Sequence, residues 1–226
     1  MLVKVCGART EADLEVLRAA GVDLAGLWHG VPGGHADLDL ATAARLAAAA
    51  RDEGGPEPVL VTLREDPGAV AAAVRATGVR WVQLHGYGRP VSVRRLRDAL
   101  GPGVALVKVL HLTGDGCVEA GLAAAYGRAG TDLFLLDRVG PGGRVGSTGL
   151  PVPDAVAAGA AAGLDRPFLR AGGVSAAGGG PFPGTLARPG FAGIDVDTAA
   201  RGAGGSLCPA RVAAVRAAWS PGGRDR

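Results

Sequence analysis

The sequence predicts an α/β protein built as a single (β/α)8 TIM barrel with a degraded seventh helix. Short apolar runs alternate with helical stretches eight times along the 226 residues. The runs are continuously apolar, which is typical of strands buried on both faces of a parallel sheet. Eight such units favour closure into a barrel. An open doubly wound sheet is the main alternative, but no Gly-x-Gly-x-x-Gly turn follows the first run.

The predicted strands are short and rich in Leu and Val. They cover residues 2–5, 24–27, 59–63, 81–84, 105–110, 133–136, 168–170 and 193–196. A predicted helix lies between most pairs of successive strands. Such helical crossovers connect parallel strands, so we expect all eight strands to point the same way.

Helices are predicted between the strands, at residues 11–20, 41–53, 67–77, 91–100, 117–129, 153–162 and 209–219. Thr10 is a suitable N-cap for the first helix, and Gly21 a suitable stop. The seventh helix should lie within residues 175–190, but this segment holds three consecutive glycines and three prolines. We expect a loop or a one-turn remnant there. Residues 1–219 are predicted to form the barrel and residues 220–226 a disordered tail.

Composition limits the class of protein. No run approaches the ~18 apolar residues of a membrane span, and the N-terminus resembles no export signal. The three cysteines lie far apart, which disfavours a disulfide framework or a zinc site. We therefore expect a soluble, cytoplasmic protein with no membrane partner. The net charge of +3 is scattered, which fits an anionic small molecule better than nucleic acid, or simply surface solubility. Nothing in the sequence indicates the oligomeric state.

Active sites of β/α barrels lie at the carboxyl ends of the strands, so the residues that end or follow each strand are the candidates. They are Cys6-Gly7, Trp28-His29, Gln83-Leu84-His85-Gly86, Lys108, Asp137-Arg138, Ala171-Gly172-Gly173 and Asp195-Val196-Asp197-Thr198.

Several of these motifs resemble one family in family order. Lys4-Val5-Cys6-Gly7 is similar to the opening motif of phosphoribosylanthranilate isomerases, and Val82-Gln83-Leu84-His85-Gly86 to their fourth strand. Leu135-Leu136-Asp137 and the loop ending Gly146-Ser147-Thr148-Gly149 resemble their sixth unit. Ala171-Gly172-Gly173 and Gly193-Ile194-Asp195-Val196 resemble their seventh and eighth. The matches cover almost the whole chain.

The resemblance implies an Amadori rearrangement, which turns an N-linked aldose phosphate into a ketose, as in tryptophan biosynthesis. An acid protonates the ring oxygen as the sugar opens to a Schiff base, and a base removes a proton from the next carbon. By resemblance, Cys6 is the general base and Asp137 the general acid. Neither step needs a metal or an organic cofactor.

Each catalytic candidate has a simpler interpretation. Cys6 could be a small core residue, and Asp137 a helix cap or an ion-pair partner. As a base, Cys6 needs a nearby positive charge that lowers its pKa. Asp137 must hold a proton at neutral pH, which burial or neighbouring negative charge favours. Lys108 could point to the rim or pair with a core carboxylate such as Asp137.

The remaining candidates would bind substrate. The resemblance implies a phosphate cup at Gly172, Gly173 and the segment after Val196, with the alternative of a tight turn that needs glycine. Gln83 and His85 follow the fourth strand, and His85 could equally be a structural hydrogen-bonding residue. The full set of predicted substrate-binding residues is His35, Gln83, His85, Arg138, Gly172, Gly173, Asp195, Asp197 and Thr198.

Three departures from the family pattern concern substrate binding. The family places an Arg for the anthranilate carboxylate where this chain has Gly33-Gly34-His35, and His cannot make the bidentate contact. Arg138 is a possible substitute. Asp197-Thr198 replaces a pair of small hydroxyl residues, and a carboxylate there repels phosphate unless a cation such as Arg201 neutralises it. The degraded seventh helix is the third departure.

Three hypotheses follow. The first is phosphoribosylanthranilate isomerase activity. The second is a paralogue of specialised metabolism that uses the same Cys/Asp pair to isomerise or cyclise a different, possibly unphosphorylated molecule. The third is a non-catalytic barrel that binds a metabolite or partner. Fold kinship alone does not separate the first two.

Overall fold

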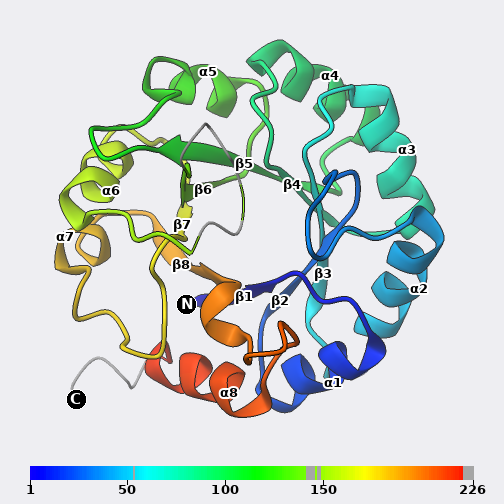
Figure 1. The fold of residues 1–226 in the computed structure, drawn as a ribbon. Coiled ribbons are helices and arrows are strands. Elements are labelled where there is room, and N and C mark those ends of the chain that lie inside the picture. Colours follow the sequence, from blue (N-terminus) through cyan, green and yellow to red (C-terminus); the bar gives the residue numbers. More distant parts are fainter. Residues whose placement is uncertain (53, 141–145, 147–148, 221–226) are drawn as a thin grey trace.

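The eight strands form a closed parallel barrel in the order β1 to β8, with the helices around the outside (Figure 1). The structure is a computed structural model and describes residues 1–52, 54–140, 146 and 149–220. The strands are β1 Leu2–Cys6, β2 Leu24–Trp28, β3 Glu57–Thr62, β4 Trp81–Leu84, β5 Ala105–Leu112, β6 Leu133–Arg138, β7 Phe168–Arg170 and β8 Phe191–Val196. The predicted fold class and all eight strands are confirmed, with most strands a few residues longer than expected.

The α-helices follow the strands in the predicted order. They are α1 Glu11–Ala19, α2 Leu40–Ala50, α3 Pro67–Thr77, α4 Pro90–Leu100, α5 Ala123–Arg128, α6 Asp154–Ala161, α7 Pro183–Leu186 and α8 Pro209–Ala218. The predicted cap of α1 is confirmed, because the Thr10 side chain accepts a hydrogen bond from the Asp13 amide and the Asp13 carboxylate accepts one from the Thr10 amide. Of the predicted helix at 41–53, residue 53 lies outside the described residues.

The helix predicted at residues 117–129 is wrong at its start. Strand β5 runs to Leu112, and Cys117 pairs with Leu112 in an isolated antiparallel bridge. A 3-10 turn at Ala120–Leu122 then leads into α5. The apolar residues of this segment therefore fold back on the strand end before the helix begins.

Alternate residues of each strand point into the barrel or out toward the helices. Val107, Val109, Leu133 and Leu135 share one inner cluster, whereas the outward residues pack under the helices. Since residues two apart on a strand share a face, the inward face of β1 carries Cys6 and Lys4. Side chains from two inward-facing clusters fill the inside of the barrel. The site must therefore lie above them, at the rim formed by the carboxyl ends of the strands.

The prediction of a one-turn remnant for the seventh helix is confirmed, because α7 has four residues. Arg170, at the end of β7, is fully buried and donates to Thr185 Oγ1 and to the Val152 carbonyl. Its guanidinium lies 3.9 Å from the centre of the Phe182 ring. Asp154 of α6 accepts hydrogen bonds from Gly184 and Thr185. Polar contacts thus hold this unit together with the packing of the short α7 against α6.

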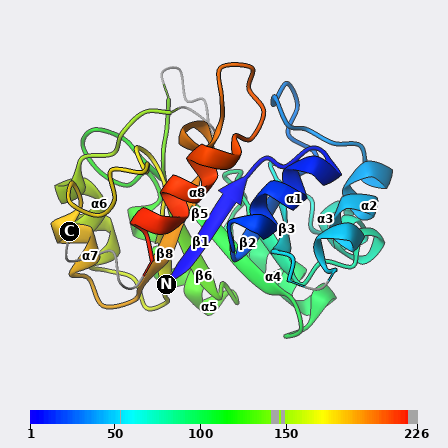
Figure 2. The ribbon, with the colours of Figure 1, turned by 90° about the horizontal axis from the view of Figure 1, so that it is seen from below.

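Long segments rise above the carboxyl ends of the strands. Figure 2 shows the loop between β2 and α2, and the segment before α8, at the end toward which β1 points. A second 3-10 turn, η3, covers Thr198–Ala200 directly after β8. Of the predicted tail, residues 221–226 lie outside the described part of the chain. None of the described helices is both long and apolar enough to cross a membrane.

Candidate active site

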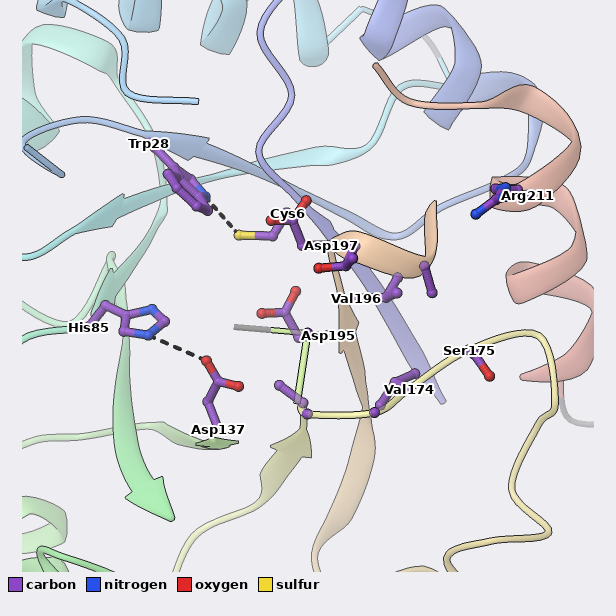
Figure 3. Close-up of a pocket in the computed structure, with 16 residues that line it drawn as sticks. Cys6, Trp28, His85, Asp137, Val174, Ser175, Asp195, Val196, Asp197 and Arg211 are labelled. Atoms are coloured by element: carbon purple, nitrogen blue, oxygen red, sulfur yellow. Dashed lines mark hydrogen bonds and ion pairs between the residues drawn. The ribbon is translucent and has the colours of Figure 1, made fainter. Parts of the chain in front are cut away.

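A cavity of about 330 Å³ lies at the carboxyl ends of the strands (Figure 3). It contains both predicted catalytic residues, Cys6 from β1 and Asp137 from β6. Its described lining is Cys6, Trp28, His85, Asp137, Gly149, Ala171, Gly172, Gly173, Val174, Ser175, Asp195, Val196, Asp197, Thr198, Ala199 and Arg211. The thiol and the carboxyl therefore share one space, as a two-group proton transfer requires.

Two nitrogen donors point at the Cys6 sulfur. Lys4 Nζ donates to Cys6 Sγ at 3.2 Å, and the indole Nε1 of Trp28 donates to it at 3.0 Å. Cys6 is 6% exposed. Figure 3 shows the sulfur turned toward the indole at one side of the cavity.

The pKa of Cys6 is raised to about 12, opposite to the direction expected from the sequence. Burial is the main cause, because it disfavours the charged thiolate. The predicted positive charge is present as Lys4 and lowers the pKa, but Asp195 and Asp197 raise it. The cavity therefore holds Cys6 as a neutral thiol at neutral pH.

Lys4 is a buried cation shared between two partners. Its Nζ donates to Asp195 Oδ1 at 2.9 Å as well as to the thiol. Burial opposes its charge, but Asp195 and Cys6 outweigh burial, so the pKa of Lys4 is raised. Burial also raises the pKa of Asp195, and Lys4 acts in the opposite direction. Lys4 thus remains charged beside the sulfur.

Gly26 provides the space in which this cluster forms. It lies on β2 opposite Cys6 in the strand register. A Cβ at Gly26 would come within 2.7 Å of Cys6 Sγ and 3.2 Å of Lys4 Nζ. Any larger side chain would displace the thiol or the ammonium group.

Asp137 lies across the cavity next to His85. His85 Nε2 is 3.4 Å from Asp137 Oδ2, and the Arg138 amide donates to Asp137 Oδ1. Gln83 Nε2 lies 3.0 Å from His85 Nδ1. When the Gln83 amide donates to Nδ1, the ring proton is on Nε2, facing Asp137. Figure 3 shows this pair facing the Cys6 side of the cavity, with Asp195 between them.

Asp197 has a cation beside it, as the sequence suggested. Arg201 Nε donates to Asp197 Oδ1 at 2.5 Å, and Arg201 also donates to the carbonyls of Cys6 and Gly7. His35 Nε2 lies 3.5 Å from Asp197 Oδ2. Arg201 therefore offsets part of the charge of the carboxylate in the expected phosphate cup.

The opposite end of the cavity offers anion-binding groups. Gly172 and Gly173 both have positive φ, 73° and 82°, so their backbone takes a path that other residues rarely adopt. Ser175, Thr198 and Arg211, which is in the first turn of α8, also line this end. The η3 turn after β8 and the start of α8, which carries Arg211, therefore both lie at this end of the cavity.

A second buried polar cluster lies behind His85. Glu119 accepts from the His111 amide at 2.8 Å and lies 2.5 Å from His111 Nδ1. His111 Nε2 faces the His85 carbonyl at 3.0 Å. Both imidazole nitrogens thus lie within hydrogen-bond distance of an oxygen acceptor. This pair anchors the backbone that carries His85.

Neither of the alternatives left open for Lys108, a position at the rim or a pairing with Asp137, is what the structure shows. Lys108 is on the outward face of β5, and its Nζ donates to the carbonyls of Gly86 and Val109, with Glu119 at 3.9 Å. Burial lowers the pKa of Lys108 to about 8, while Glu119 acts in the opposite direction.

The cavity brings together most of the predicted substrate-binding residues. His85, Gly172, Gly173, Asp195, Asp197 and Thr198 line it, whereas His35, Gln83 and Arg138 are absent from the described lining. Sequence reasoning missed Lys4 and Arg211 as parts of the site, and it placed Trp28 at a strand end without giving it a role. The i, i+2 spacing of Lys4 and Cys6 on one strand was a usable signal. Ser147 and Thr148 of the predicted sixth-unit loop lie outside the described residues.

Among the described residues, no three His, Cys, Asp or Glu side chains gather as a metal site. The ionisable side chains of the described lining are instead one thiol, three carboxyl groups, one imidazole and one guanidinium. This set suits proton transfer on an anionic or polar small molecule.

Comparison with known proteins gives consistent results. The N-(5'-phosphoribosyl)anthranilate isomerase of Cereibacter sphaeroides is 31% identical over 218 residues, which is 94% of this chain and 95% of the relative. That of Afipia carboxidovorans is 33% identical over 178 residues, covering 78% of this chain and 72% of the relative. No family model matches the sequence.

Solved structures agree in fold. The phosphoribosyl anthranilate isomerase of Thermococcus kodakaraensis matches with a TM-score of 0.74 at 26% identity, over 96% of this chain and 97% of that chain. The Thermus thermophilus enzyme of the same name gives 0.75 at 23% identity, over 96% and 98%.

Proposed function

The chain belongs to the phosphoribosylanthranilate isomerase family, and we propose that it converts phosphoribosylanthranilate into the corresponding ketose by an Amadori rearrangement. It is an isomerase of the intramolecular oxidoreductase class. The observation that carries the proposal is that Cys6 and Asp137 open onto one cavity. The comparisons do not favour the alternative of a paralogue with another substrate.

The first step is ring opening, with Asp137 as the acid. The lone pair of the anthranilate nitrogen forms a C=N bond with the anomeric carbon as the bond from that carbon to the ring oxygen breaks. The Asp137 proton goes to the released oxygen. The result is a protonated Schiff base and an Asp137 carboxylate, 3.4 Å from His85 Nε2, whose proton stabilises the new negative charge.

The second step is proton removal, with Cys6 as the base. The Cys6 thiol first gives its own proton to solvent. The thiolate then takes the proton from the carbon next to the imine, and the C–H electron pair forms a C=C bond. The C=N electron pair moves to nitrogen, giving an enol amine that tautomerises to the ketose. Burial favours the neutral thiol. The hydrogen bonds from Lys4 and Trp28 to the sulfur act in the opposite direction and favour the thiolate, which is the form that reacts.

The substrate phosphate is proposed to bind at the end of the cavity that contains Gly172, Gly173 and Arg211. Backbone N–H groups and a guanidinium suit a phosphate. This orientation places the sugar between Cys6 and Asp137, which lie on either side of Asp195 (Figure 3). Arg201 reduces the repulsion from Asp197.

The direct test follows loss of phosphoribosylanthranilate with purified protein. Wild-type protein should convert it rapidly, and Cys6→Ser and Asp137→Asn should each lose roughly 10²- to 10⁴-fold in kcat, the usual contribution of one acid or base. The matched controls Cys208→Ser and Asp98→Asn lie outside the described cavity lining and should retain activity. The wild-type gene should also complement a tryptophan auxotroph that lacks this isomerase.

Absence of conversion by folded wild-type protein would refute the proposed substrate. Full activity of a Cys6→Ala, Asp137→Ala double variant would refute the proposed catalytic pair and favour a non-catalytic role for these residues.

A further inference from the structure

We propose that Trp28 is a positioning residue for the catalytic thiol: its indole N–H fixes the Cys6 sulfur and stabilises the thiolate during catalysis. This inference rests on the proposed role of Cys6 as the base. The carrying observation is the 3.0 Å hydrogen bond from Trp28 Nε1 to Cys6 Sγ (Figure 3). The indole has one N–H, and it is directed at the sulfur.

The indole is held firmly in this orientation. Trp28 is the last residue of β2 and is 5% exposed. The His35 ring packs against it edge to face, with 4.8 Å between ring centres. A Cβ at Gly34 would lie 3.0 Å from two carbons of the indole, so the bare glycine backbone lies against the ring.

This packing gives a reason for one departure from the family pattern. The segment Gly33-Gly34-His35 replaces the residues that carry the family's Arg, and in this chain Gly34 and His35 contact the indole. His35 also reaches Asp197 Oδ2. The altered loop thus packs on the donor to the thiol rather than on the cavity.

Each charged group near the Cys6 thiol is itself paired with a group of opposite charge, so the uncharged indole N–H of Trp28 is an important donor to the thiolate. Lys4 approaches from β1, but its charge is shared with Asp195 of β8. Asp197 follows β8 and opposes ionisation, and Arg201, which binds the Cys6 carbonyl, is itself paired with Asp197. Asp137 and His85 occupy the other side of the cavity.

Each of these two cations has a carboxylate beside it, so its attraction for the thiolate is partly offset. The indole N–H carries no counter-charge, so its attraction for the thiolate is not offset. A hydrogen bond to a charged group changes its pKa by about one unit or more.

The test measures thiol reactivity without substrate. The rate of Cys6 alkylation by iodoacetamide is followed on the Cys6 peptide by mass spectrometry between pH 7 and 10. Only the thiolate reacts, so Trp28→Phe should slow the reaction about tenfold at each pH, the equivalent of a one-unit rise in thiol pKa. Trp81→Phe makes the same change on β4 and should leave the rate unchanged.

A second variant separates the hydrogen bond from the shape of the ring. Replacing Trp28 alone with 3-benzothienylalanine keeps a bicyclic ring but removes the N–H. It should also slow alkylation about tenfold and lower kcat by a similar factor, with little change in KM. A rate within twofold of wild type in this variant would overturn the proposal.

The alkylation result does not depend on the identity of the substrate. Slower alkylation in both variants supports the role of Trp28 whatever the wild-type protein converts. Loss of conversion by wild-type protein would instead count against the proposed function, so the two failures are distinguishable.

Discussion

Arg201 Nε lies 2.5 Å from Asp197 Oδ1, while the same guanidinium donates to the carbonyl of Cys6. One cation therefore neutralises the carboxylate in the cavity wall and ties the segment after β8 to the strand that carries the thiol. Gly7 permits this arrangement, because a Cβ there would lie within 2.5 Å of the guanidinium.

The first prediction concerns this carboxylate. Asp197→Asn should lower KM for the phosphorylated substrate about fivefold, because it removes roughly 1 kcal/mol of repulsion between two negative groups. Arg201 keeps its contacts to the carbonyls of Cys6, Gly7 and Gly205. Initial rates across substrate concentrations measure the effect. Asp165→Asn, at an exposed site, is the control, and a higher KM in Asp197→Asn would contradict the prediction.

The second prediction concerns Gly26. Gly26→Ala places a methyl group 2.7 Å from the resting position of Cys6 Sγ, so the thiol must move away from the substrate. We expect kcat to fall at least about tenfold, since displacement of a reacting group by ~1 Å is costly. Gly159→Ala is the matched control, because a Cβ there meets nothing within 4 Å. Equal kcat for both variants would show that the thiol position is not limiting.

The third prediction concerns pH and Lys108, whose pKa burial lowers from 10.5 to about 8. Below about pH 8 the folded and unfolded states both carry the proton, and burial of the charge destabilises the fold. Between pH 8 and 10.5 only the unfolded state holds the proton, so stability rises with pH. Relative to Lys108→Met, the free energy of unfolding should increase by up to about 3 kcal/mol over this range. Urea unfolding at pH 7, 8, 9 and 10 measures it, and a constant difference would refute it.

The fourth prediction concerns the Glu119–His111 pair. Glu119→Gln leaves the imidazole without its anionic partner in a buried site and should lower the free energy of unfolding by about 2 to 4 kcal/mol. Glu57→Gln breaks an ion pair in which Arg80 is 69% exposed, so the loss should be much smaller than in Glu119→Gln. Urea unfolding of both variants provides the comparison. A loss in Glu119→Gln no larger than that in Glu57→Gln would mean that the pair is not stabilising.

Most of the fold follows from the local sequence. Continuous Leu- and Val-rich runs identified every strand, because a parallel barrel buries both faces of its sheet. The glycines and prolines between Val174 and Phe191 predicted the loss of the seventh helix. The start of α5 was missed because the Leu112–Cys117 bridge is a tertiary pairing that no local pattern encodes.

The site was only partly predictable for a related reason. Residues at strand ends indicate the rim, which placed Cys6 and Asp137 correctly in one cavity. Continuous apolar runs do not reveal which face points inward, so the outward direction of Lys108 on β5 was not among the alternatives considered. The sign of the Cys6 pKa shift depends on burial, which the sequence did not quantify.

The buried guanidinium beneath α7 bears on how this chain diverges. Arg170 donates hydrogen bonds directly to Thr185 and Val152. The position of the seventh unit therefore depends on a few polar contacts and not on a long helix packed against the sheet. The exposed residues Ala176, Ala177 and Gly180 are then under little selection for size or helical tendency, and small residues can accumulate there by mutational drift. Evolution can thus rewrite this stretch while the neighbouring Gly172–Gly173 backbone keeps its course.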